Sequence, residues 1–299
     1  MDKVLVLVGP TASGKSSVAV ELARLYNGEI ISGDSMQIYR QLNIGTAKIS
    51  EAEKKGIRHH LLDNKDISES YSVYDFQKSG REIIKQISQN NKLPIVVGGT
   101  GLYIKALLYD YCFNEINNAV RDYSSYSNLE LFSLIKKQDS QAAAKLHPNN
   151  RKRLLSTMKL LDSLPGNKSE FLAQQDRQPI YDVLMIGLTR DRQQLYQRIE
   201  ERVDRMFAGG LLAEVESLVR SDPNVFNYQA FQAIGYKEFK AYFRKENSLE
   251  EVKEQIKVHT RQFAKRQYTW FNNQMPLHWI DSDKADCQDK ICKLINQWL

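Results

Sequence analysis

The stretch VLVLVGPTASGKSS at residues 4–17 restricts the possible folds of this chain more than any other feature. Aliphatic and β-branched residues predict a strand, a glycine-containing loop follows it, and helical periodicity begins directly after the loop. In this strand–loop–helix context, the spacing G-x-x-x-x-G-K-[ST] predicts a phosphate-binding loop. Its residues are Gly9, Pro10, Thr11, Ala12, Ser13, Gly14, Lys15 and Ser16.

Each part of this loop has a physical reason to face an anion. The backbone amides and the amino terminus of the following helix point toward phosphate oxygens. Lys15 supplies a point charge, and the Ser16 hydroxyl is placed to meet Mg²⁺. We therefore expect a bound phosphate or diphosphate at residues 9–16.

Further strands are expected at EIIS (29–32), LPIVVGG (93–99) and YDVLMIGLTRD (181–191). The second of these is apolar throughout, as expected for a strand buried on both faces of a parallel sheet. Strands that alternate with helices predict a parallel α/β sheet covered on both sides. A ligand should lie beyond the carboxyl ends of such strands, where the loop, Asp34 and Thr100 all fall.

The domain organisation follows from a change in composition after residue 114. Residues 115–178 are polar and helix-prone, with helices expected in SNLELFSLIKKQ and RKRLLSTMKLL and a loop at LPGNKSE. They predict a helical insertion within a core formed by residues 1–114 and 179–299. Residues 192–273 are expected to be mostly helical, followed by an edge strand at PLHWID and a final helix at KICKLINQWL.

Composition excludes some classes of protein. The net charge of +6 and the pI of about 9.0 point weakly toward a polyanionic partner. No apolar run approaches the roughly 20 residues that span a bilayer, and no signal peptide is apparent. The three cysteines and the pair His59-His60 have no metal-ligand spacing, so we expect free thiols and a cytoplasmic location.

Two polar residues at the expected ligand edge each have two interpretations. Asp34 could cap a helix beginning at SMQIYR, or it could act as a general base or a Mg²⁺-linked carboxylate. The Thr100 hydroxyl could cap the following helix or hydrogen-bond a reacting group. Position alone leaves both pairs of alternatives open.

The signals of triphosphate hydrolysis are missing. The strand at 93–98 ends without the carboxylate that usually holds Mg²⁺ in hydrolases. Asn64-Lys65-Asp66 is followed by Ile67, so a guanine-recognition motif is also absent. A small-molecule kinase that uses ATP and an RNA-binding ATPase remain as alternatives.

Two helices carry many cations. Arg198, Arg202 and Arg205 share one helix face, either in surface ion pairs with Glu200, Glu201 and Asp204 or as a clamp for a phosphate. Lys253, Lys257, Arg261 and Lys265 recur every fourth residue beside an apolar seam of Val252, Ile256, Phe263 and Trp270. This stripe predicts either an RNA-binding face or a solvated surface. Arg151-Lys152-Arg153 form another basic cluster at an expected helix start.

Eight runs of the chain, in this order, resemble the tRNA dimethylallyltransferase family, also called tRNA isopentenyltransferases. The runs are GPTASGKS, SGDSMQIYR, GIRHHLLD, VVGGTGLYIKAL, LHPNNRKR, RIEERVDRMFAGGLLAEV, QAIGYKEF and TRQFAKRQYTWF. They span residues 3 to about 272. Without a zinc-finger extension, the chain is similar to the bacterial type.

The resemblance implies transfer of a dimethylallyl group from its diphosphate to N6 of the adenine 3′ of the anticodon. The substrates would be tRNAs that read codons starting with U, and Mg²⁺ would be required. The fold would be a core like that of nucleotide kinases, with the insertion gripping the anticodon stem-loop. No membrane and no obligate protein partner is implied.

The resemblance also implies a role for individual residues. The loop 9–16 and Arg198 would bind the diphosphate, with Ser16 at Mg²⁺, while Asp34, Thr100 and Arg202 would be catalytic. Contacts to tRNA are implied for Asp34, Ser35, Met36, Gln37, Arg121, Lys152, Arg153, Gln232, Ala233, Ile234, Gly235, Tyr236, Lys237, Lys265, Arg266, Gln267 and Trp270. Asn150, Ser156 and Lys159 depart from the family pattern, which affects the expected anticodon-stem contacts.

Overall fold

The computed structural model describes residues 1–111, 121–163 and 178–299, and these form two compact units. One unit contains Met1–Leu108 and Pro179–Leu299, and the other is Tyr109–Gln178. The expected boundary between residues 114 and 115 and the expected loop LPGNKSE lie outside the described residues.

The first unit is built on a six-stranded sheet in which every pair of neighbouring strands is parallel. The strand order is β3-β2-β4-β1-β5-β6. The strands are β1 (Lys3–Val8), β2 (Gly28–Ser32), β3 (His59–His60), β4 (Leu93–Gly98), β5 (Asp182–Thr189) and β6 (His278–Asp281). The expected parallel α/β sheet and the edge strand at PLHWID are confirmed. The two-residue strand β3 was not predicted, since it is too short to show a periodic pattern.

The register of the central strands brings the predicted site together. Val8 at the end of β1 lies opposite Gly98 at the end of β4, so the loops that follow them are neighbours. The chain leaving β2 passes so close that a Cβ at Gly98 would lie 2.4 Å from the Gly33 carbonyl oxygen. Glycine is therefore required where the three loops converge.

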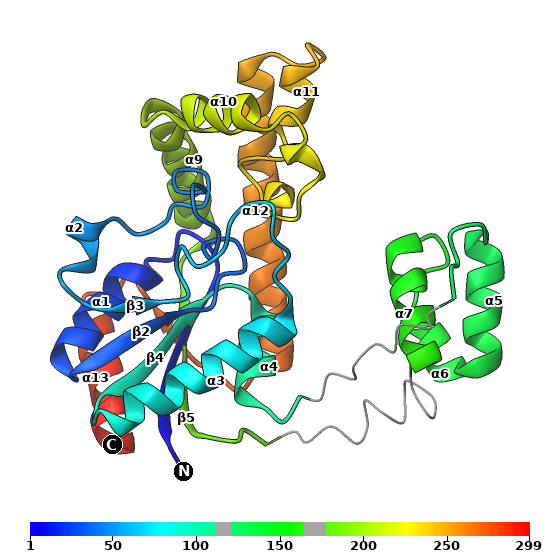
Figure 1. The fold of residues 1–299 in the computed structure, drawn as a ribbon. Coiled ribbons are helices and arrows are strands. Elements are labelled where there is room, and N and C mark those ends of the chain that lie inside the picture. The colour runs from blue at the N-terminus through cyan, green and yellow to red at the C-terminus, as the bar shows by residue number, and fades with distance from the viewer. Residues whose placement is uncertain (112–120, 164–177) are drawn as a thin grey trace. The chain divides into compact units, whose positions relative to one another are not determined.

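Helices cover both faces of the sheet (Figure 1). On one face, α1 (Lys15–Leu25) and α13 (Cys287–Trp298) join the strands in a common core that includes Leu22 and Ile291. On the other face lie α3 (Val73–Gln89) and α4 (Gly101–Leu108). Helix α3 was not predicted individually, although Ser72 and Asp75 form a capping box at its start.

A helical extension of the first unit continues from β5 beyond the carboxyl edge of the sheet (Figure 1). Helices α9 and α12 pack against each other there, which confirms the expected helical character of residues 192–273. The extension contains α9 (Arg192–Ala208), α10 (Leu211–Ser221), the short 3-10 helices Val225–Asn227 and Ala230–Gln232, α11 (Phe239–Phe243) and α12 (Leu249–Gln274). The short helix α2 (Glu51–Lys54) lies in the loop that precedes β3.

The second unit consists, in its described part, of α5 (Asn128–Gln138), α6 (Ser140–Ala144) and α7 (Arg151–Ser163) around a small apolar core. Asn150 Oδ1 accepts a hydrogen bond from the Arg153 amide at 3.2 Å, as a helix N-cap does. Asparagine caps as well as aspartate does, so this departure from the family pattern preserves the start of α7. The Arg151 guanidinium donates to the backbone carbonyls of Tyr126 and Ser124, whereas Lys152 and Arg153 are exposed.

Cys287 is buried and Cys292 half-buried, and both are free thiols, as expected. Cys112 lies outside the described residues. Among the helices that the structure describes, none is long and apolar enough to cross a membrane.

Candidate functional site

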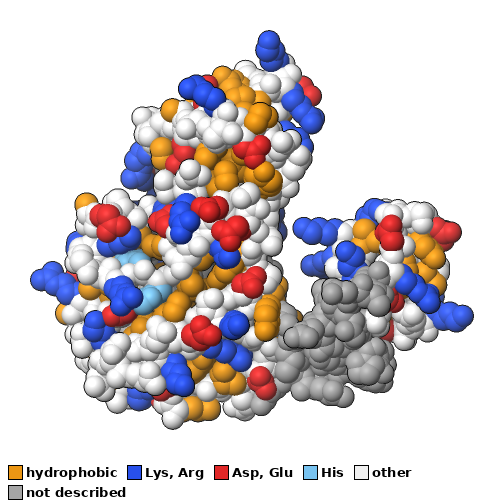
Figure 2. Space-filling model, in the orientation of Figure 1, with side chains coloured by type: hydrophobic (Ala, Val, Ile, Leu, Met, Phe, Trp, Pro, Cys, Tyr) orange, Lys and Arg blue, Asp and Glu red, His pale blue; other side chains and the backbone are white. Residues whose placement is uncertain are grey.

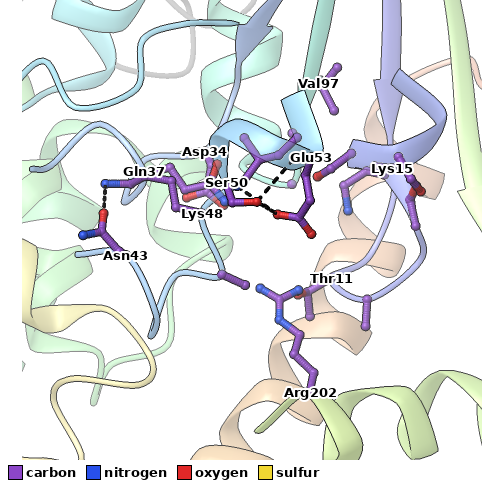
Figure 3. Close-up of a pocket in the computed structure, with 18 of the residues that line it drawn as sticks. Thr11, Lys15, Asp34, Gln37, Asn43, Lys48, Ser50, Glu53, Val97 and Arg202 are labelled. Atoms are coloured by element: carbon purple, nitrogen blue, oxygen red, sulfur yellow. Dashed lines mark hydrogen bonds between the residues drawn. The ribbon is translucent and has the colours of Figure 1, made fainter. Parts of the chain in front are cut away.

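A cavity of about 800 Å³ opens where the loops after β1, β2 and β4 converge with α9 and α12 (Figure 3). The side chains and backbone of several segments line it. They include Thr11, Ala12, Gly14, Lys15, Ser16, Asp34, Gln37, Ile44, Lys48, Ser50, Glu53, Val97, Gly98, Gly99, Arg198, Arg202, Arg205, Met206, Phe263 and Gln267. The carboxyl edge of the sheet, which the sequence predicted as the ligand site, therefore carries this cavity.

The predicted phosphate loop forms one wall. Gly9 has φ 146°, and a Cβ there would lie 2.3 Å from the Leu188 carbonyl oxygen, so only glycine fits. Lys15 Nζ donates to the Pro10 carbonyl at 2.6 Å, and the Ser16 side chain is exposed at the cavity. Ser13 is fully buried beneath the loop, so its side chain does not line the cavity.

Lys15 is electrostatically strained in the free protein. Burial, and next the nearby Arg202 guanidinium, lower the pKa of Lys15 to about 7, while Asp34 partly opposes this shift. Burial also lowers the pKa of Arg202. Lys15 and Arg202 lie close together, and the negative charge of Asp34 offsets theirs only in part. The cavity therefore favours binding of an anion.

Asp34 does not cap a helix, which removes one of its two interpretations. Residues 35–38 form turns, and Asp34 Oδ1 accepts the Met36 amide at 2.9 Å within this turn. Its carboxylate lies near enough to Lys15 and Arg202 to influence the pKa of both. The acidic group therefore faces the cations across the cavity (Figure 3).

Thr100 precedes α4, but its hydroxyl is directed to the neighbouring turn. Thr100 Oγ1 accepts the Ser35 amide at 3.2 Å and lies 3.5 Å from Ser35 Oγ. Thr100 thus ties the loop after β4 to the Asp34 turn and holds both at the edge of the cavity.

Arg202 bridges two loops at the cavity wall and makes no ion pair with a described carboxylate. Its Nη1 donates to Thr11 Oγ1 at 3.0 Å, and its Nη2 donates to the Thr46 carbonyl at 3.3 Å. Arg198 and Arg205 also line the cavity. Two carboxylates of α9, Glu200 and Asp204, pair with cations of α12. They are therefore not paired with the arginines that line the cavity.

Two carboxylates of α9, Asp204 and Glu200, pair with most of the predicted basic stripe on α12. Lys253 and Lys257 both contact Asp204 at 3.0 Å, and Arg261 contacts Glu200 at 2.5 Å. These three cations therefore cross-link α12 to α9 and do not form a freely solvated surface, while the RNA-binding alternative stays a prediction. Farther along the helix, Lys265 and Arg266 are exposed.

The predicted apolar seam of α12 is only half right. Val252 and Ile256 are buried, but the buried positions then continue at Ala264, Gln267 and Phe271. Phe263 instead lines the cavity. The helix rotates its buried face slightly with each turn, which a fixed spacing does not capture.

Gln267, for which a tRNA contact is predicted, lines the cavity but is mostly buried. The side chain is 6% exposed. Its Oε1 accepts the Thr11 amide at 2.8 Å, and its Nε2 donates to the Gly99 carbonyl at 3.0 Å. Gln267 is therefore an internal brace that fastens α12 to the phosphate loop and to the end of β4.

The segment 232–237 divides into exposed and buried residues. Gln232 and Lys237 are exposed and Ile234 is half-buried, but Ala233, Gly235 and Tyr236 are buried. Tyr236 has no exposed surface, and its hydroxyl donates to Glu214 Oε1 at 2.6 Å. The Tyr236 side chain is therefore enclosed, and a tRNA contact of this segment stays a prediction, for which Gln232 and Lys237 are the exposed candidates.

Several lining residues were not predicted. Lys48 Nζ contacts Asp63 Oδ1 and the Tyr39 carbonyl, and it lies at the cavity together with Ser50 and Glu53. The pattern S-x-x-E at 50–53 is a helix-start signal that could have indicated α2. No local pattern indicated that this segment returns to the phosphate loop.

The donor groups at the cavity fit a magnesium ion held mainly through a ligand's phosphates. In the part of the chain that the structure describes, no three His, Cys, Asp or Glu side chains gather to hold a metal. Mg²⁺ commonly keeps several waters and binds through one or two protein oxygens and substrate phosphates. The Ser16 hydroxyl could supply one of those oxygens.

Comparison with known proteins identifies the family. The family model described as IPP transferase matches residues 37–274. A tRNA dimethylallyltransferase from Anoxybacillus flavithermus is 47% identical over 94% of this chain and 90% of its own length. The chain belongs to the IPP transferase family. The similarity covers both described units, so membership extends beyond the phosphate loop.

Solved structures of the family share the fold. A tRNA isopentenylpyrophosphate transferase from Staphylococcus epidermidis is 40% identical, with a TM-score of 0.75 over 99% of this chain and 100% of that one. A eukaryotic dimethylallyltransferase acting on tRNA is 29% identical, with a TM-score of 0.87 over 98% of this chain and 78% of that one. The predicted fold class and family resemblance are confirmed, and an ATP-dependent kinase is not favoured.

Proposed function

We propose that this IPP transferase moves a dimethylallyl group from dimethylallyl diphosphate to N6 of the adenine 3′ of the anticodon in tRNAs that read codons starting with U. The observation that carries the proposal is the placement of Asp34 across the cavity from Lys15 and Arg202. In this arrangement the base, Asp34, and the cations that would bind diphosphate line the same cavity. Since the substrate is tRNA, we expect the reaction in the cytoplasm.

The reaction balances without a further co-reactant. The adenine N6 attacks the allylic carbon, a C–N bond forms, the C–O bond to diphosphate breaks, and Asp34 accepts the proton from N6. An aromatic amine is a poor nucleophile, so removal of its proton during attack assists the reaction. Thr100 holds the turn that carries Asp34.

The leaving diphosphate gains charge as the C–O bond breaks. Loop amides, Lys15 and the guanidinium of Arg202 are fixed in advance at the opposite wall, and groups fixed in this way stabilise developing charge effectively. Bound Mg²⁺, held at Ser16 and the phosphates, would neutralise further charge on the leaving group.

The tRNA must reach this cavity with its adenine out of the loop stack, which costs a few kcal/mol. Exposed Lys265 and Arg266 and the half-buried Trp270 border a surface cavity of about 620 Å³ on α12. Cations beside an aromatic ring suit phosphates and an unstacked base. Figure 2 shows further basic side chains at the free end of the helical extension near α11, where Lys240, Arg244 and Lys245 are exposed.

In the second unit, Arg121, Lys152 and Arg153 are among the exposed cations. We assign these three to the anticodon stem, because exposed cations suit phosphate contacts. Ser35, Met36 and Gln37 are half-buried, and Gln37 lines the cavity; we expect this segment to meet the adenine itself.

The choice of donor tests the proposal against the kinase alternative. Purified protein, Mg²⁺ and an anticodon stem-loop should release diphosphate from dimethylallyl diphosphate and should leave ATP intact. Consumption of ATP with no loss of dimethylallyl diphosphate would refute the proposed function.

Lys15 predicts a pH dependence for binding of inorganic diphosphate. The pKa of Lys15 is about 7 in the free protein, and a bound anion should raise it. Affinity should therefore be greatest below about pH 7, decline as the pH rises, and be accompanied by proton uptake near neutral pH. Calorimetry in buffers of different ionisation enthalpy measures this uptake. Lys15→Met should bind more weakly and lose that part of the uptake; an identical proton count in both proteins would contradict the prediction.

The exposed cations of α12 predict a change in salt dependence. Joint replacement of Lys265 and Arg266 by Ala should weaken stem-loop binding and lower the slope of log K against log salt by about 1 to 2. Lys257→Ala is the matched control, because Lys257 is paired with Asp204 and should leave the slope unchanged. If Lys257→Ala lowered the slope as much, the stripe would be an RNA face after all.

A further inference from the structure

Helix α10 sends one carboxylate toward the loop that precedes α2. Glu214 Oε2 accepts the backbone amides of Asn43 at 3.1 Å and Ile44 at 2.9 Å. Glu214 Oε1 accepts the Gly45 amide at 3.4 Å. A single side chain thus collects three consecutive amides, and each such charge-assisted bond is stronger than a neutral one.

Tyr236 completes this bracket from the other side. Its buried hydroxyl donates to Glu214 Oε1 at 2.6 Å and accepts the Gly45 amide at 3.1 Å. Burial and the charge of Glu214 raise the pKa of Tyr236, so the hydroxyl keeps its proton at all ordinary pH values. The loop is therefore held by two side chains that also hold each other.

The bracketed loop in turn holds two groups of the active site. The Thr46 carbonyl, one residue beyond the bracket, accepts Arg202 Nη2 at 3.3 Å and Gln37 Nε2 at 3.2 Å. Arg202 Nη1 donates to Thr11 Oγ1 in the phosphate loop. A guanidinium is planar, so two acceptors at fixed positions set its orientation.

We propose that Glu214, with Tyr236, is a positioning residue that sets the Arg202 guanidinium over the diphosphate site by fixing the loop 43–46. This inference rests on the proposed function, because it takes Arg202 to contact the diphosphate. Glu214 itself does not line the cavity, so it acts only through the loop.

Binding of inorganic diphosphate with Mg²⁺, measured by calorimetry without RNA, tests the inference. Glu214→Gln should raise the Kd about 10-fold, since an amide presents a donor to backbone amides that need an acceptor. In an Arg202→Ala background the same change should alter the Kd by less than about twofold, because the group that it positions is gone. Glu216→Gln, on the same helix, is the matched control and should bind as wild type does.

A purely structural role would give a different result. Equal losses from Glu214→Gln with and without Arg202, or no loss in either, would overturn the inference. If Glu214→Gln does not fold, Tyr236→Phe allows the same cycle, because it removes one hydroxyl from the bracket; we expect a Kd increase of about threefold that vanishes without Arg202. Failure of the wild-type protein to bind diphosphate would instead refute the proposed function, and this inference with it.

Discussion

Replacement of Asp34 by Asn should lower kcat for prenyl transfer by about 100- to 10,000-fold, the usual contribution of a general base. Asn retains an oxygen that can accept the Met36 amide, so the turn at residues 34–36 should persist. It cannot take the proton from N6. Single-turnover transfer to a stem-loop, monitored by mass spectrometry, measures the loss.

Two comparisons make the Asp34 result specific. Stem-loop affinity of Asp34→Asn should stay within about twofold of wild type, because the change removes chemistry and not the binding surface. Asp66→Asn, which alters an exposed carboxylate paired with Arg40, should leave kcat unchanged. Near-normal transfer by Asp34→Asn would reduce Asp34 to a residue of the turn.

Replacement of Arg202 by Ala should lower kcat by about 100- to 1,000-fold, as expected when a fixed charge donor is removed from a developing anion. Arg202→Lys should recover little of this loss, because one ammonium cannot reproduce the planar fork that reaches both Thr11 and Thr46. The same single-turnover experiment measures the rate of transfer. The affinity for diphosphate shows how much of the loss comes from weaker binding in the ground state.

Arg192 provides the control for Arg202 on the same helix. The Arg192 Cζ atom lies 5.2 Å from the centroid of the Tyr196 ring. Arg192→Ala should therefore transfer at the wild-type rate. If Arg202→Ala raised only KM and left kcat intact, Arg202 would bind the donor uniformly and would not stabilise the transition state.

The central sheet and phosphate loop could be predicted because their signals are local. The apolar run at 93–98 and the spacing of Gly9, Gly14 and Lys15 depend on residues adjacent in sequence. Parallel strands place their carboxyl ends at one edge, which brought Asp34 and Thr100 to the correct place.

The partners of charged side chains could not be predicted, since they depend on how helices pack. Lys253 and Lys257 matched the spacing of a basic stripe, but their contact with Asp204 appears only when α9 lies beside α12. Gln267 and Tyr236 belong to segments that resemble tRNA-contacting ones, yet both are buried. A resemblance identifies a segment, whereas packing decides which of its side chains reach a ligand.

The proposed transfer is tested most directly with dimethylallyl diphosphate that carries an isotopic label on a carbon of its dimethylallyl group. After incubation with the protein, Mg²⁺ and an anticodon stem-loop, nuclease digestion and mass spectrometry should place the label on N6 of the adenine 3′ of the anticodon. One diphosphate should be released for each group transferred. Label on another nucleotide or on none, or a phosphoryl group transferred in its place, would contradict the account.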